Sequence, residues 1–256
     1  MVSENRPQDA AYRPLVQEVD LRSTPGLNFE AVLPRIRRIM FIALAAIVTL
    51  DLLASVGAAE GAPYTLTRFF DGDLKVNFPT GYKTTFLLMA FALLVILSAW
   101  ARRVGDPFTR GWQLLAAVTG FAFVDETVYL HQSISRTLQE HLHTDGVLRF
   151  AWTILYLPAA FAVGIVLLRY ITRLEARSRL PLLSGGALYA FAAVGLEPVK
   201  SHLSSSRGED SLAFKLAAFV SDSLEMIGLT ILVVVLLTLL AQRVRHVSFA
   251  LRQSRS

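Results

Sequence analysis

The most informative apolar run of this chain is LAAFVSDSLEMIGLTILVVVLLTLLA, residues 216–241. At about 1.5 Å per residue, a helix of this length crosses a hydrocarbon core of about 30 Å. The run nevertheless contains Asp222 and Glu225. A charged side chain inside a span costs a few kcal/mol unless it faces the interior of the bundle. The stretch therefore predicts a membrane-spanning helix with one face turned towards a polar site.

Five further apolar runs precede it, and together they define the fold class. The runs lie near 39–59, 84–101, 112–131, 149–169 and 182–202, with 216–241 as the sixth. Of the 256 residues 54% are hydrophobic and 18% charged, whereas about a quarter of a soluble domain is charged. We expect an all-α, integral membrane six-helix bundle built from three helical hairpins, with a polar tail over 1–38, a transmembrane domain over 39–242 and a basic tail over 243–256.

The composition also excludes several classes of protein. The absence of cysteine rules out a disulfide scaffold, and the high apolar content rules out disorder. A pI near 9.7 is typical of nucleic-acid-binding domains, but seventeen of the 25 basic residues fall in the two tails and in the second and fourth connections. The positive-inside rule then predicts that both termini are cytoplasmic. The basic charge is a topology signal, and we expect no nucleic-acid partner.

Carboxylates recur at one depth of the predicted bundle. Spans one, three and five run outward and carry their acids late, whereas span six runs inward and carries its acids early. All six acids therefore fall in the outer half of the membrane; they are Asp51, Asp125, Glu126, Glu197, Asp222 and Glu225. His131 and His202 end the third and fifth spans. Four helices thus bring acids and imidazoles to one layer near the outer face.

Residue spacing in the third span refines this layer. Asp125, Tyr129 and Gln132 are four and three residues apart and share one face of a regular helix. Glu126 and His131 are five apart, about 140° around a helix of about 3.6 residues per turn. Both point inward only if the end of the helix unwinds.

The fifth span repeats that spacing. Glu197 and His202 are five apart, and Pro198 directly after Glu197 predicts a kink, because proline removes a backbone donor and frees a carbonyl one turn back. Lys200 is a predicted positive partner for the acids.

The leading hypothesis is a metal site in an enzyme that acts on a lipid or another membrane-soluble substrate. Carboxylates and imidazoles from several helices build di-iron and di-manganese centres, and similar sets bind zinc. A bound iron, zinc, copper or manganese ion would activate water or oxygen. The Glu-x-x-His spacing of ferritin-like sites is absent, and no catalytic residue is assigned. The candidate ligands are Asp125, Glu126, His131, Glu197, His202, Asp222 and Glu225, with Asp51, Tyr129, Gln132 and Lys200 as further polar site residues.

Two alternatives stay open. Acids and histidines within a membrane also form proton or ion pathways, which would make the protein a proton-coupled transporter or channel. The same groups form ion-pair networks between helices, as in a non-catalytic subunit of a membrane complex. The expected partners are the lipid bilayer and either further copies of this chain or other membrane subunits.

Four short elements resemble those of an uncharacterised family of bacterial polytopic inner-membrane proteins. They are Asn77-Phe78-Pro79-Thr80 before the second span, Asp125-Glu126 with His131, Gly195-Leu196-Glu197, and the run from Asp222 to Gly228 with Glu225-Met226. Their order and spacing match over about residues 70–230. Gln132 and Asp222 stand where that family often has Glu. The resemblance implies a multi-pass protein of the bacterial inner membrane that shares these polar positions, and it implies no activity.

Overall fold

The structure is a computed structural model that describes residues 29–70 and 77–253, and within these ranges it is helical without strands. The predicted tail residues 1–28 and 254–256, and 71–76 of the connection before the second span, lie outside the described residues. The helices are α1 (Phe29–Ala59), α2 (Tyr64–Thr67), α3 (Phe78–Val104), α4 (Thr109–Val128), α5 (Leu130–Leu142), α6 (Thr153–Ile171), α7 (Ala176–Ala190), α8 (Glu197–Arg207) and α9 (Leu212–Gln253), with a 3₁₀ helix η1 (Gly146–Leu148) and a π-helical turn η2 (Phe191–Gly195).

Five helical segments are long and apolar enough to cross a membrane: Val32–Ala59, Phe78–Val104, Thr153–Ile171, Ala176–Arg207 and Leu212–Arg243. A sixth, α4 with α5, passes the same test only as a pair bent by 71°. The all-α class and the positions of the predicted spans agree with this arrangement. The third predicted span differs, because it breaks before its expected end at residue 131 and the chain turns aside as α5.

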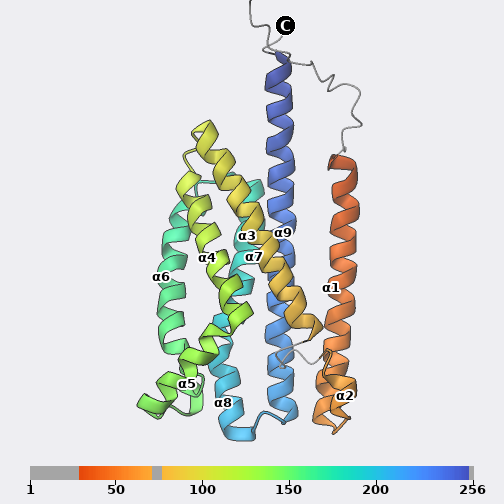
Figure 1. Ribbon diagram of the computed structural model, residues 1–256, viewed down its shortest axis with the longest axis vertical. Helices are drawn as coiled ribbons and strands as arrows, with labels where there is room; N and C mark the ends of the chain where they lie inside the picture. Colours follow the sequence, from red (N-terminus) through yellow and green to blue (C-terminus); the bar gives the residue numbers. More distant parts are fainter. Residues whose placement is uncertain (1–28, 71–76, 254–256) are drawn as a thin grey trace, which may run out of the picture.

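Helix α9 is the centre of the bundle, where it packs against α1, α3, α7 and α8 (Figure 1). α4 lies against α3, and α6 stands at the edge beyond α4. α2, α5 and α8 lie together at one end, which we call the α5 end, and α9 projects beyond the bundle at the other end.

Close backbone contact joins α7 to α9. A Cβ on Gly228 would lie 2.7 Å from the Tyr189 amide nitrogen, and one on Gly185 would lie 3.0 Å from the Gly228 carbonyl oxygen. Only glycine allows this approach. Gly185 therefore serves close packing between the two helices. The adjacent Gly186 differs, because a Cβ there meets nothing within 4 Å.

The Asn-x-Pro-Thr element is the N-terminal cap of α3. The Asn77 side chain accepts a hydrogen bond of 2.7 Å from the Thr80 amide, and Pro79 stands in the first turn, where its missing N–H costs nothing. The helix therefore begins at Phe78, six residues before the predicted span. Lys83 consequently lies inside the helix and not in a connection.

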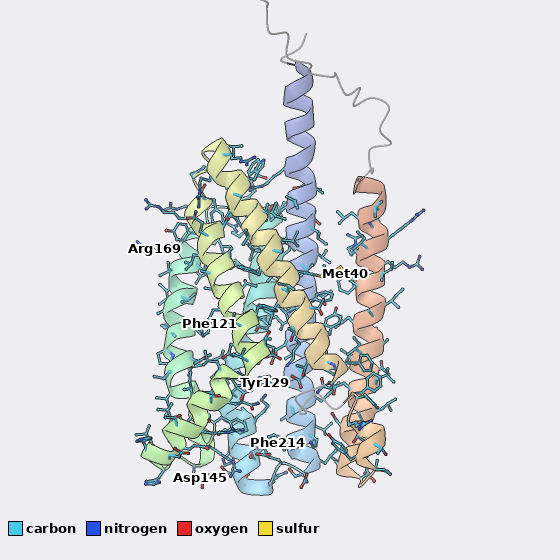
Figure 2. All side chains as sticks on the ribbon, in the orientation of Figure 1. Met40, Phe121, Tyr129, Asp145, Arg169 and Phe214 are labelled. Carbon is cyan, nitrogen blue, oxygen red and sulfur yellow. The ribbon has the colours of Figure 1, made fainter. Side chains whose placement is uncertain are left out.

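The break between α4 and α5 is centred on Tyr129. This residue adopts a left-handed conformation, with φ 56° and ψ 43°, which costs a non-glycine residue about 1–2 kcal/mol. In Figure 2 Tyr129 is labelled at the elbow where the two helices meet. The unwinding that would let both acid and histidine of the third span face inward is present.

The regular α-helix is interrupted just before Pro198, while Ala176–Arg207 still runs as one segment long enough to cross a membrane. α7 ends at Ala190, the π turn η2 follows, and α8 begins at Glu197 with Pro198 in its first turn. The Ser221 hydroxyl of α9 donates a hydrogen bond of 2.9 Å to the Ala192 carbonyl and holds η2 against α9. Single π turns often mark functional positions in helices.

Candidate functional site

Lys83 is the centre of a cluster of three carboxylates from two other helices. Its Nζ lies 2.7 Å from Asp222 Oδ1, 3.2 Å from Glu225 Oε2 and 3.5 Å from Glu126 Oε1. The lysine side chain is only 8% exposed. A buried ammonium needs such partners, because desolvation otherwise costs several kcal/mol. We call Lys83, Glu126, Asp222 and Glu225 the Lys83 cluster.

A second group joins α4, α5 and α6. Asp125 Oδ2 lies 2.8 Å from His131 Nδ1, and Oδ1 accepts hydrogen bonds from the His131 amide and the Tyr156 hydroxyl, both 2.9 Å long. The turn at Tyr129 brings a histidine six residues along the chain back to the aspartate. No partner for His131 Nε2 occurs among the residues that the structure describes. A carboxylate on Nδ1 holds the tautomer in which Nε2 is the basic nitrogen.

Trp152 supports the imidazole of that pair. Its ring centroid lies 5.2 Å from that of His131 and 4.9 Å from that of Tyr156, in an edge-on arrangement with the tyrosine. The histidine is therefore held by a carboxylate at one nitrogen and by an indole beside its ring.

A third group is the ion pair of Glu197 with Lys200 at the start of α8. Glu197 is buried, and the lysine also interacts electrostatically with Asp222 and Glu225 of α9. The pair therefore lies within electrostatic range of the Lys83 cluster. The predicted role of Lys200 as a counter-ion agrees with this geometry.

The three groups open into one cavity of about 1220 Å³ between α3, α4, α6, α7 and α9. Away from the charged groups its lining is apolar, with Leu167, Ile171 and Leu182 among the residues furthest from the α5 end. Phe121 and Leu155 also line it, although they are 51% and 53% exposed on the outside of the bundle. The cavity thus has a charged end and an apolar end, and it reaches the surface beside α4 and α6.

The structure brings most of the predicted site residues to this cavity, but not all of them. Asp51 is fully buried in α1 and does not line the cavity. His202 is exposed on α8 and does not line it either. The predicted residues that line the cavity are Asp125, Glu126, Tyr129, His131, Gln132, Glu197, Lys200, Asp222 and Glu225.

Two residues of the site were missed from the sequence. Lys83 falls just before the second predicted span at 84–101, and Tyr156 lies in the fourth predicted span without being among the predicted site residues. The Asn77 cap would have placed Lys83 correctly, since it starts the helix six residues earlier and sets the lysine at the depth of the acids. No sequence signal distinguishes Tyr156 from an interfacial tyrosine.

Within residues 29–70 and 77–253, no group of three or more His, Asp or Glu side chains is placed to hold a metal ion. Three of the seven predicted ligands instead surround the ammonium of Lys83. The Asp125–His131 pair does resemble the arrangement in which a carboxylate orients a metal-binding histidine through its other nitrogen.

The family model described as "Domain of unknown function (DUF8692)" matches residues 39–240. No curated protein and no solved structure matches the chain. The match covers the segment from α1 to α9 that forms the cavity.

Proposed function

This chain belongs to the DUF8692 family, and we propose that it is a membrane enzyme that acts by acid–base chemistry on a membrane-soluble amphiphile. The observation that carries the proposal is the Asp125–His131 pair at the charged end of a cavity whose remaining wall is apolar. Such a cavity admits a molecule with a polar head and an apolar body. The imidazole stands where the head would lie.

His131 is the proposed general base. Its Nε2 takes a proton from water or from a substrate hydroxyl, and the Asp125 carboxylate stabilises the imidazolium that results. Tyr156 holds the carboxylate in place through its hydrogen bond. The ammonium groups of Lys83 and Lys200 are paired with carboxylates, and in this proposal they hold those acids in place beside the histidine.

The substrate would enter from the bilayer. α6 has only 6% of its most apolar window buried inside the bundle, and the exposed Phe121 and Leu155 mark the place where the cavity meets the surface. A membrane-soluble molecule can therefore reach the site between α4 and α6 without crossing the water phase.

A turnover assay with a matched control tests the proposal. Wild-type protein in nanodiscs is incubated with a total lipid extract from a bacterial membrane, and the lipids are compared by mass spectrometry over time. We expect a lipid species that the wild type consumes and that His131→Gln leaves unchanged. His141→Gln is the control, because His141 is exposed on α5, hydrogen-bonds to the Thr137 carbonyl of its own helix and is not part of the cavity lining.

Either of two results would overturn the proposal that this protein is an enzyme. One is a wild type that changes no lipid species, and the other is conversion that persists in His131→Gln. Asp125→Asn keeps His131 but removes the carboxylate that orients it, so it tests whether that orientation matters for turnover. It should slow turnover while leaving His131 available, because an amide no longer stabilises the imidazolium.

A bound metal ion is the second candidate, favoured by the orientation of His131 and by the excess of carboxylates at the charged end. His131 and Glu126 would be ligands, and a divalent or transition metal would supply a Lewis acid that activates water. Elemental analysis of wild type and His131→Gln, purified without chelator, tests it. Stoichiometric metal that disappears in the variant supports a metalloenzyme, and metal-free wild type argues for acid–base chemistry by the side chains alone.

We also propose that both termini are cytoplasmic and that the α5 end faces the outside of a bacterial inner membrane. The basic residues of the connections support this: Arg102 and Arg103 end α3 at the end opposite α5, and Figure 2 labels Arg169 of α6 near that same end. Because the chain lacks cysteine, single-cysteine variants report accessibility cleanly. An impermeant maleimide should label Glu140→Cys in intact cells and should label Glu175→Cys only after lysis; the reverse pattern would contradict this orientation.

A further inference from the structure

We propose that the substrate has an uncharged or cationic head and a long apolar tail, and that the tail lies in the part of the cavity between Gly164 of α6 and Gly186 of α7. This inference rests on the proposed function, because it names the class of molecule that the acid–base site would act on. We call the apolar part of the cavity, from Tyr156 to Ile171 along α6, the tail channel.

The length of the tail channel sets the length of the tail. Tyr156 and Ile171 both line the cavity, and a helix rises about 1.5 Å per residue, so they stand about 22 Å apart along α6. Half of a hydrocarbon core is about 15 Å. A tail that fills the channel therefore extends beyond the middle of the bilayer. A short-chain substrate would leave the inner part of the channel empty.

Two glycines give the tail channel its width. Gly164 and Gly186 line the cavity from different helices, and a Cβ at either position would meet nothing within 4 Å. Their lack of a side chain is therefore not required by helix packing, unlike that of Gly185, whose Cβ would lie 3.0 Å from a backbone oxygen. Open space next to both glycines is available to a ligand.

The charged end selects the head. Six carboxylates line the cavity against four cationic side chains, Lys83, Lys200, Arg136 and Arg149; the acids are Asp125, Glu126, Glu197, Glu209, Asp222 and Glu225. An additional anionic head would meet repulsion in a region of low dielectric constant, whereas an amine or a hydroxyl would find acceptors. Arg149 at the mouth does not reverse this balance, since it lies 3.8 Å from Glu209.

Binding of a homologous series tests both parts of the inference. Tritiated hexadecylamine, hexadecanol and palmitate, with octylamine as the short homologue, are bound to protein in zwitterionic nanodiscs. Each probe is measured against protein-free nanodiscs of the same lipid, so that its partition into the bilayer is subtracted before probes or variants are compared. We expect the amine and the alcohol to bind the wild type roughly tenfold more tightly than palmitate.

Substitutions in the tail channel should act by tail length. Gly186→Leu should weaken hexadecylamine binding roughly tenfold and change octylamine binding less than about twofold. Gly164→Leu provides the same obstruction from α6, in case one variant fails to fold. Ala162→Leu is the control, because Ala162 is exposed on α6 and does not line the cavity. Its binding should equal that of the wild type.

The outcomes separate this inference from the enzyme itself. If palmitate binds as tightly as the amine and the alcohol, the proposed preference for an uncharged or cationic head is wrong. If hexadecylamine binding is unchanged in both glycine variants, the proposed position of the tail is wrong. The binding series is repeated with His131→Gln, which should keep its selectivity although turnover is lost. Selective binding without turnover in the wild type would overturn the enzyme and leave the ligand class standing, whereas turnover without selective binding would do the opposite.

Discussion

Removing the charge of Lys83 tests the electrostatics of the site most directly. At an effective dielectric constant of about 20, each of its three contacts with Asp222, Glu225 and Glu126 corresponds to about 5–6 kcal/mol of attraction. Desolvation of the ammonium and repulsion among the carboxylates offset most of this. Loss of one partner of a buried ion pair costs about 3–5 kcal/mol, because the remaining charges stay buried without compensation.

We therefore expect Lys83→Met to lower the free energy of unfolding by about 3–5 kcal/mol. The measurement is reversible unfolding by SDS in mixed micelles, with thermal unfolding in detergent as a second readout. Arg173→Met, which removes an exposed charge in the connection between α6 and α7, is the control and should change stability by less than about 0.5 kcal/mol.

A double-mutant cycle shows whether the lysine acts through its acids. Asp222→Asn removes the nearest carboxylate, and the combination with Lys83→Met should cost about 0.5–3 kcal/mol less than the sum of the single changes. An additive cycle, or a Lys83→Met variant as stable as the wild type, would refute the view that this ammonium compensates the acids.

Of three further predictions, two concern the backbone, at Tyr129 and Gly228, and one concerns the surface hydrogen bond between Ser205 and Asp145. Tyr129→Asn should leave thermal stability unchanged or raise it, while Tyr129→Val should lower it by about 1–2 kcal/mol, since asparagine tolerates the left-handed conformation and a β-branched residue does not; equal melting temperatures would refute this. Gly228→Ala should destabilise by about 1–3 kcal/mol through collision with α7, whereas Gly186→Ala should be neutral in the same melting assay. The hydrogen bond of 2.6 Å from the Ser205 hydroxyl lowers the pKa of the Asp145 carboxyl, so it stabilises the fold above the unfolded-state pKa of about 3.9 and loses its effect as the pH falls through the lowered value. Ser205→Ala should accordingly melt below wild type at neutral pH, and the difference should shrink in acid; a difference that grows in acid would contradict the assignment.

The fold was predictable because a bilayer permits few structures. Backbone groups in hydrocarbon must satisfy one another, so each long apolar run is read as a helix with little ambiguity. The depth of the acids followed from the same runs and their alternating direction. Glu126, Glu197, Asp222 and Glu225, which were predicted to share one layer, all line one cavity.

The partners within that layer were less predictable, because they depend on breaks in helices. The pairing of Asp125 with His131 requires a left-handed Tyr129, a conformation that no local preference of tyrosine indicates. The same break moves His131 away from the regular helical position assumed for it. Asp51 illustrates a second limit of the sequence. The hydropathy of α1 indicates the depth of this residue along the helix, but it does not indicate which helices pack beside it.

The balance of charge bears on the purely structural alternative. A network that only joins helices needs matched charges and a dry, filled interior, and apolar residues of similar volume stabilise a bundle as well or better. Here six carboxylates face two lysines and two arginines, and all of them border a cavity of about 1220 Å³. In addition, Asp125 makes its hydrogen bonds to His131, which they orient, and not to a lysine. An ion-pair network explains Lys83 and Lys200, but it leaves the cavity and the oriented histidine without a role, and acid–base chemistry on a bound amphiphile accounts for both.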